Sequence, residues 1–249
     1  MTNKIKYFIA NWKMNGTNKS VNLHKKIVKF SKKKNFNSNI VYCPPITLVR
    51  SFQKIFKKSK IKLGAQNCFY KDQYGPYTGQ LSPKMLKESG CDFIILGHSE
   101  SRQQGDNNNI INQKIINSIN SRLKIILCFG ETLNEKRKKI TNKVISRQIS
   151  QALKNVKNKN NILFSYEPVW SIGTGNVLNE HDLKKYLLFI KKLLISKHKI
   201  KKPNILYGGS VNSSNIKTLK NINNLDGFLI GSASLKVNKF IDIIKKTYN

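Results

Sequence analysis

Eight short apolar runs, each followed by a longer segment of helical period, constrain the fold of this chain more than any other feature. The runs lie at residues 5–11, 39–44, 61–67, 92–97, 124–130, 161–167, 204–209 and 226–231. Their nearly continuous apolarity is typical of strands in a parallel sheet covered on both faces. Eight strands close a barrel, and about 250 residues is its usual length. The 249-residue chain is therefore predicted to be an α/β protein, a single (β/α)8 barrel with eight parallel strands, in which residues 1–249 form one domain.

The segments between these runs have the period of amphipathic helices. In one of them an apolar stripe recurs at helical spacing, while lysines at 184, 185, 191 and 192 occupy the other face. The stripe comprises Leu183, Tyr186, Leu187, Ile190, Leu193 and Leu194. We interpret those lysines as a solvated face. Asn179, with Asp182 three residues later, is predicted to cap the start of this helix.

The formal net charge of +34, from 46 Lys plus Arg against 12 Asp plus Glu, raises the question of anionic partners. Such charge favours nucleic acid or anionic membranes. Lys is accompanied by abundant Asn and Ile, however, which is typical of a coding sequence rich in A and T. The basic residues are also spread along the chain without a nucleic-acid-binding motif. We therefore expect no nucleic-acid or membrane binding beyond nonspecific charge attraction.

The four cysteines and the N-terminus bear on the compartment. Cys43, Cys68, Cys91 and Cys128 are widely spaced in or beside apolar segments, with no CxxC pair. This pattern predicts reduced, mostly buried thiols and no zinc site. The first apolar run is too short for a signal peptide, and no run reaches about 18 apolar residues. We expect a soluble, cytoplasmic protein.

Function in such a barrel is expected where the strands run into the following loops. Those positions are Asn11 to Lys13, Gln66 and Asn67, Gly97 to Glu100, Cys128 to Glu131, Glu167 to Gly175, Gly208 to Ser210 and Gly231 to Ser234. They contain a lysine, a histidine, carboxylates and glycine-bearing loops, which suit proton transfer on a small phosphorylated molecule.

Each of these residues has a plainer explanation when it is considered alone. Lys13 could be one more surface lysine, and His98 a structural histidine. Glu167 could simply end a strand, while the glycines at 208, 209 and 231 could be turn residues that need positive φ. Only their joint placement on one predicted rim favours a functional site.

Five motifs in order resemble the triosephosphate isomerase family. They are NWKMNG (11–16), GHSE (97–100), SYEPVWSIGTG (165–175), YGGSV (207–211) and IGSASL (230–235). The resemblance covers essentially the whole chain, and the first three motifs together are highly specific. It implies a TIM barrel and an isomerase of glycolysis and gluconeogenesis, which interconverts dihydroxyacetone phosphate and D-glyceraldehyde 3-phosphate through an enediolate. It also implies that the enzyme uses no metal or organic cofactor.

The same resemblance implies a role for each site residue. Glu167 would be the base, and a neutral His98 would donate a hydrogen bond to the enediolate oxygens. Lys13 and Asn11 would contribute positive charge and a polar donor beside the substrate. Supporting roles would fall to Glu100, which holds the lysine, and to Ser99, which meets the base when a lid is open. Backbone N–H groups around four residues would bind the phosphate: Gly173, Ser210, Gly231 and Ser232.

A stretch of twelve residues without Lys or Arg, residues 165–176, resembles the family's base and mobile lid. Its lid would comprise Pro168, Val169, Trp170, Ser171, Ile172, Gly173, Thr174, Gly175 and Asn176. A lid that closes on a dianion gains nothing from further charges that must be desolvated. The stretch is therefore interpreted as functional.

The chain departs from the family pattern at a few positions. Gln80 and Ser101 stand where the family usually has a glutamate and an arginine that form an ion pair. Because both charges are missing, neither is left as a buried, unpaired ion. We therefore expect the family's homodimer to persist, with Thr78 at the tip of the loop that enters the neighbouring subunit near Asn11.

Two further departures affect the phosphate loop and the lid. Ser232 replaces a glycine, which would cause strain if that position needs positive φ. Residues 176–178 read Asn-Val-Leu, bulkier than the family's usual trailing hinge, and could change opening rates.

Two other functions remain open at this point. A decayed barrel could bind nucleic acid through its positive surface, with poor turnover and binding that depends steeply on salt. Another sugar-phosphate barrel enzyme, such as an epimerase, would share the phosphate loops. The intact set of Lys13, His98 and Glu167 argues against the first, and the GHSE and YEPVW motifs argue against the second.

Overall fold

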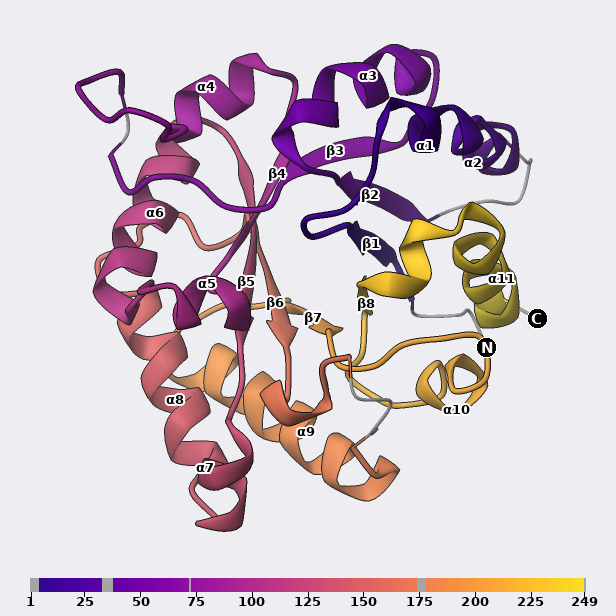
Figure 1. Ribbon diagram of the computed structural model, residues 1–249. Helices are drawn as coiled ribbons and strands as arrows, with labels where there is room; N and C mark the ends of the chain where they lie inside the picture. The colour runs from indigo at the N-terminus through magenta and orange to yellow at the C-terminus, as the bar shows by residue number, and fades with distance from the viewer. Residues whose placement is uncertain (1–4, 33–37, 72, 174–177, 249) are drawn as a thin grey trace.

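The computed structural model describes residues 5–32, 38–71, 73–173 and 178–248. Eight parallel strands follow one another around a closed barrel, in which β8 pairs with β1 (Figure 1). The strands are β1 (Tyr7–Asn11), β2 (Asn39–Cys43), β3 (Lys62–Ala65), β4 (Phe93–Leu96), β5 (Lys124–Phe129), β6 (Ile162–Tyr166), β7 (Asn204–Tyr207) and β8 (Gly227–Ile230). Each lies within one of the eight predicted runs, so the predicted (β/α)8 barrel is confirmed.

Alternation along the strands explains why the runs are apolar throughout. Ile9, Val41 and Leu229 belong to one buried cluster, which packs among the strands themselves. Their neighbours Phe8 and Ala10 belong to a second cluster, shared with the surrounding helices. Because successive side chains point to opposite faces of a strand, both faces must be apolar when a barrel encloses one core and helices cover the other.

Helices form the outer ring around the barrel in Figure 1. They are α1 (Asn18–Leu23), α2 (Lys25–Ser31), α3 (Ile46–Phe56), α4 (Pro83–Glu88), α5 (Ser99–Gln103), α6 (Asn108–Asn120), α7 (Leu133–Arg137), α8 (Thr141–Ala152), α9 (Glu180–Ser196), α10 (Ile216–Leu219) and α11 (Val237–Tyr248). Two short 3-10 helices, η1 (Val169–Ser171) and η2 (Ser232–Leu235), follow β6 and β8. No helix in the described ranges has the length and apolarity needed to cross a membrane.

Helix α9 shows how local sequence produces one of these elements. The side chain of Asn179 accepts a hydrogen bond of 2.8 Å from the backbone N–H of Asp182, as predicted for the cap. Of the predicted apolar stripe, Leu183, Leu187, Ile190 and Leu194 are buried, and Tyr186 and Leu193 are partly buried against the same core. The cap satisfies an N–H group that has no partner within the helix, and the stripe supplies the packing energy.

The sequence analysis also made predictions about the cysteines and about the loop after β3. All four cysteines are free and buried, as expected. The loop of residues 66–82 between β3 and α4 extends away from the barrel (Figure 1). Its tip is exposed and includes Thr78 and Gln80.

Candidate active site

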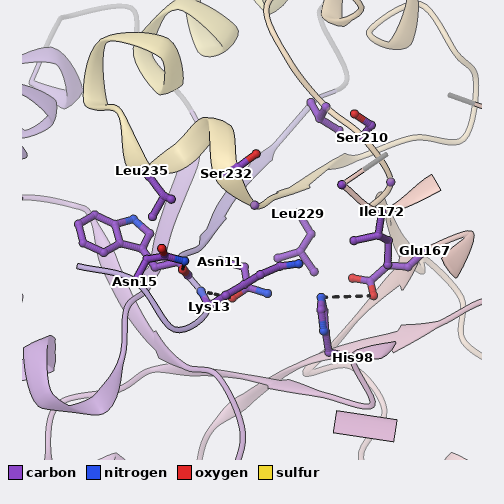
Figure 2. Close-up of a pocket in the computed structure, with 16 residues that line it drawn as sticks. Asn11, Lys13, Asn15, His98, Glu167, Ile172, Ser210, Leu229, Ser232 and Leu235 are labelled. Carbon is purple, nitrogen blue, oxygen red and sulfur yellow. Dashed lines mark hydrogen bonds and ion pairs between the residues drawn. The ribbon is translucent and has the colours of Figure 1, made fainter. Parts of the chain in front are cut away.

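A cavity of about 140 Å³ lies at the carboxyl end of the strands and collects most of the predicted site residues (Figure 2). Its walls contain Asn11, Lys13, His98, Glu167, Gly173, Ser210, Gly231 and Ser232. Ser99 and Glu100 are not part of this lining. Residues from β1, β4, β6, β7 and β8 meet here because the carboxyl ends of parallel strands share one end of the barrel.

Lys13 occupies a strained backbone position just beyond β1. Its φ is +54°, a conformation that costs about 1–3 kcal/mol for a non-glycine residue. The Asn11 side chain accepts from its N–H at 3.1 Å, and Gln66 Nε2 donates to its carbonyl at 2.8 Å. At the other end of the side chain, Nζ donates to Glu100 Oε1 at 2.8 Å. Both the backbone and the ammonium group are therefore held in place.

His98 caps the N-terminus of α5, and this position determines its tautomer. Its Nδ1 accepts a hydrogen bond of 3.3 Å from the backbone N–H of Glu100. A backbone amide can only donate, so Nδ1 is the acceptor in this contact, which places the ring proton on Nε2. That nitrogen points toward Glu167, with 3.8 Å between His98 Nε2 and Glu167 Oε2 (Figure 2).

Glu167 is almost completely buried at the end of β6, with 2% of its surface exposed. Burial raises the pKa of this carboxyl group, and a hydrogen bond from Cys128 and the positive charges of Lys13 and Arg102 partly offset that shift. Oε1 lies 3.5 Å from the hydroxyl of Ser165, whereas Oε2 has no hydrogen-bond partner among the described residues. A buried carboxylate oxygen without a partner, facing a cavity, is well suited to accept a proton from a bound molecule.

The glycines around Glu167 provide space for it. A Cβ at position 208 would lie 2.6 Å from Glu167 Cγ and 2.8 Å from Oε1, and one at position 130 would overlap the Glu167 carbonyl. The plainer explanation of positive φ is wrong for residues 208, 209 and 231, since the described glycines with positive φ do not include them. At 208 and 209 the glycine permits close approach of neighbouring atoms, since a Cβ there would lie under 3.0 Å from Glu167 or Tyr207. A Cβ at 231 would make only an ordinary contact of 3.7 Å with Lys13.

The other end of the cavity presents backbone N–H groups. Within the described residues, the amides of Gly209, Gly231 and Ser232 have no hydrogen-bond acceptor. The Ser210 amide makes a long hydrogen bond of 3.4 Å to Ser171 Oγ. Ser232 is not among the residues with positive φ, so the strain considered for its replacement of glycine does not arise. Unpaired amides from two loops form an arrangement suited to an anion.

Glu131 is a residue whose role the sequence did not reveal, although it lies on the predicted rim. It is fully buried beyond β5 and accepts from Trp170 Nε1 at 2.9 Å and from the Tyr166 hydroxyl at 3.1 Å. Its carbonyl accepts from Val169 N–H at 3.0 Å. Glu131 thus fixes the start of the predicted lid. The sequence feature that could have identified Glu131 is a carboxylate just beyond an apolar strand.

Gln66 is a second residue of this kind. Its Nε2 group donates to two carbonyls, those of Lys13 and Cys43, each at 2.8 Å. It therefore links the strained turn after β1 to the end of β2. No local pattern identifies such a brace, because both partners are distant in the sequence.

The predicted lid is described only in its first part. Pro168 to Gly173 follow β6 through η1, and Ile172 and Gly173 line the cavity. Thr174, Gly175 and Asn176 lie outside the described residues, as does residue 177 of the predicted trailing hinge. Ser99 is buried at the start of α5, and in the described part of the chain no hydrogen bond joins it to Glu167.

Fold and site together define a class of protein: a (β/α)8-barrel enzyme in which a buried carboxyl group, an imidazole and an ammonium group held by a carboxylate surround one small cavity. The family model described as triosephosphate isomerase matches residues 6–247. The chain belongs to the triosephosphate isomerase family, and it is an isomerase.

Individual relatives agree with the family match. A triosephosphate isomerase of Thermodesulfovibrio yellowstonii is 38% identical over 244 residues, which cover 96% of this chain and 98% of the relative. One of Wolbachia pipientis is 40% identical, with 96% and 92% covered. Among solved structures, triosephosphate isomerase from Bartonella henselae superposes with a TM-score of 0.89 at 34% identity, covering 98% of this chain and 99% of that one.

Proposed function

We propose that this chain interconverts dihydroxyacetone phosphate and D-glyceraldehyde 3-phosphate, the triose phosphate step of glycolysis and gluconeogenesis. The observation that carries the proposal is the convergence of three groups on one cavity. Lys13, His98 and Glu167 come from β1, β4 and β6, and all three line it. Two of them face each other at 3.8 Å between Nε2 and Oε2.

Glu167 acts as the base in this mechanism. Its unpartnered Oε2 removes a proton from the carbon beside the substrate carbonyl and returns it to the neighbouring carbon. The enediolate formed between the two steps carries negative charge on its oxygens. His98 donates from Nε2 to these oxygens and shuttles protons between them, while the Lys13 ammonium and the Asn11 amide stabilise the charge.

The phosphate is bound by main-chain donors. The amides around Gly173, Ser210, Gly231 and Ser232 supply them, and the free amides of residues 209, 231 and 232 support this assignment. Glu100 holds the Lys13 ammonium, and Ser99 meets the base when the lid is open.

We assign residues 168–176 to a lid that closes over the substrate. Exclusion of water strengthens the electrostatic contacts and protects the enediolate. The contacts of Glu131 with Trp170 and Val169 support a hinge at the first part of this segment.

A homodimer is the proposed assembly, with residues 1–249 acting as one catalytic domain in each subunit. Met14, next to the catalytic lysine, is 95% exposed, and Tyr74 in the extended loop is 62% exposed. Both side chains are accessible to a partner subunit, which a dimer formed through these segments requires. In the dimer, Thr78 at the tip of that loop reaches the partner subunit's site near Asn11. A cytoplasmic location fits this role.

A coupled assay tests the proposal directly: purified protein is supplied with D-glyceraldehyde 3-phosphate, and dihydroxyacetone phosphate is detected through its reduction. We expect robust turnover without added metal or cofactor. Absence of turnover, together with salt-sensitive binding of nucleic acid, would instead favour a decayed barrel. Turnover of a pentose phosphate alone would favour an epimerase.

A further inference from the structure

Three buried polar atoms that have no hydrogen-bond partner among the described residues lie in one aromatic cluster behind the active site. They are Trp12 Nε1, His24 Nε2 and the Tyr42 hydroxyl. The three side chains are at most 1% exposed. Their ring centroids are 4.7 Å apart for Trp12 and His24, 5.6 Å for His24 and Tyr42, and 6.3 Å for Trp12 and Tyr42. Buried polar atoms normally have a protein or water partner, so three orphans in mutually packed rings require an explanation.

The hydrogen-bonding capacities of the three groups are complementary. His24 Nδ1 lies 3.0 Å from the carbonyl of Ser20, which can only accept, so Nδ1 carries the proton and Nε2 is an acceptor. Burial lowers the pKa of His24 and outweighs the backbone contacts with Ser20 and Ser234, so the ring is neutral near pH 7. The Trp12 indole N–H can only donate, and the Tyr42 hydroxyl can do either.

We propose that a buried water molecule bridges Trp12 Nε1, His24 Nε2 and the Tyr42 hydroxyl. The water accepts from the indole N–H, donates to the imidazole, and exchanges a hydrogen bond with the phenol. This satisfies all three orphan atoms and gives the water three partners, the usual number for an internal water. Direct hydrogen bonds among the three groups do not satisfy them, since none of these atoms has a hydrogen-bond partner among the described residues.

The water site stands directly behind the catalytic turn. Trp12 lines the active-site cavity and precedes Lys13 in the chain. The turn wraps its ring closely, since a Cβ at Gly16 would lie 2.6 Å from Trp12 Cζ3. The Trp12 carbonyl also accepts from Asn15 at 3.0 Å. A shift of the indole therefore moves the strained Lys13 backbone, and His24 acts through the water as a positioning residue. This last step rests on the proposed function of Lys13.

The water itself is tested without reference to activity. In protein labelled with ¹⁵N-tryptophan, the variant Trp170→Phe leaves Trp12 as the only indole, and a water-selective NOE experiment then detects contact of its N–H with bound water. We expect a cross-peak in the Trp170→Phe background that is lost on adding His24→Leu. Phe52→Leu, in the same cluster, keeps all three polar atoms and should retain the cross-peak. A crystal structure should show the water; absence of both signals overturns the site.

The positioning role is tested by kinetics in otherwise unmodified protein. His24→Leu should lower kcat, by up to about 10²-fold if the catalytic turn moves by about 1 Å, with a smaller change in KM. His24→Gln, which keeps an acceptor, should restore much of the loss, and Phe52→Leu should leave kcat nearly unchanged. Equal losses in His24→Leu and Phe52→Leu contradict the positioning role. If the water is found but the unmodified protein has no isomerase activity, the proposed function fails and the water site stands.

Discussion

At the scale of single residues, the environment of Glu167 favours the proposed proton transfer but lowers the stability of the folded state. Its carboxyl group is buried, its pKa is raised by desolvation, and one oxygen has no hydrogen-bond partner. An ionised carboxylate in such a place destabilises the native state, because the unfolded chain hydrates it fully. The same features leave it free to take a proton from substrate.

Glu167→Gln should therefore separate activity from stability. We expect kcat to fall by roughly 10² to 10⁴, the usual share of a general base, while the melting temperature at pH 7 rises. The folded-state pKa is raised, so the penalty of ionised Glu167 is present above that pKa and vanishes below the unfolded value of 4.5. The gain in stability should accordingly disappear near pH 4.

Steady-state kinetics and calorimetry at two pH values check this prediction. Glu180→Gln, which removes a half-exposed carboxylate on α9, is the matched control and should leave kcat unchanged. Retention of full turnover in Glu167→Gln would rule out its role as the base.

Gly208 is the second residue whose substitution is informative. A Cβ there would meet Glu167 Cγ at 2.6 Å, so Gly208→Ala should displace the base without a left-handed backbone to strain. We expect a large loss of kcat with a folded protein. Because the added methyl acts on the base, KM should change less than kcat.

Circular dichroism and the coupled assay measure the two effects of Gly208→Ala. Combining it with Glu167→Gln should cause little further loss, since both changes act on the same group. Losses that multiply independently would show that the methyl acts elsewhere.

At the scale of elements, the loop after β3 is anchored to α6 through Asn67, which contacts a buried ion pair between α6 and the segment that precedes it. Lys114 Nζ lies 2.7 Å from both carboxylate oxygens of Asp106 and 3.1 Å from Asn67 Oδ1. The two charged side chains are 5% and 13% exposed. Asn67 lies two residues beyond the end of β3, and its side-chain oxygen accepts from Lys114. This network therefore determines where the extended loop leaves the barrel.

Removing one partner of this pair should be costly. Lys114→Met leaves the Asp106 carboxylate buried and unpaired, and we expect a loss of about 3–5 kcal/mol in the free energy of unfolding. The double variant Lys114→Met with Asp106→Leu should lose much less than the sum of the two single variants. Denaturant unfolding at fixed protein concentration measures all three.

An exposed pair provides the comparison. Lys184→Met breaks the contact with Glu180 on the surface of α9, where both side chains are about half exposed, and should cost less than about 1 kcal/mol. Similar losses at positions 114 and 184 would contradict the role assigned to burial.

At the scale of the whole molecule, the net charge of +34 affects both stability and encounter with substrate. Positive charges that repel one another destabilise the compact state, while the same field attracts a dianionic substrate toward the cavity. The chain has few carboxylates, and two of them, Glu100 and Asp106, pair with Lys13 and Lys114. These two do little to neutralise the positive charge of the other surface lysines.

Salt should therefore have two opposite effects. Between about 0.01 M and 0.15 M NaCl the screening length falls from about 30 Å to about 8 Å, and we expect the melting temperature to rise while kcat/KM for the phosphorylated substrate falls. Unphosphorylated glyceraldehyde, which is neutral, serves as the control and should show little change in kcat/KM. A salt-independent rate for the phosphorylated substrate would exclude steering by the field.

Much of this architecture could be predicted because it depends on periodic patterns. The eight apolar runs, the stripe of α9 and its Asn179 cap are local features whose geometry follows from residue spacing. The convergence of Lys13, His98 and Glu167 could also be predicted, because parallel strands in a closed barrel bring their carboxyl ends together. The resemblance to a known family then supplied their roles.

The sequence by itself determined the barrel, its order of strands and the end at which the reactive side chains gather, since these depend on period and on the number of repeated units. Only the tertiary structure showed why residue 208 is a glycine, how Gln66 braces the turn after β1 and why the pKa of Glu167 is raised. It alone also brought the unpartnered polar atoms of Trp12, His24 and Tyr42 together. Each of these depends on which distant segments pack together and exclude water, and that information is not contained in any local stretch of the chain.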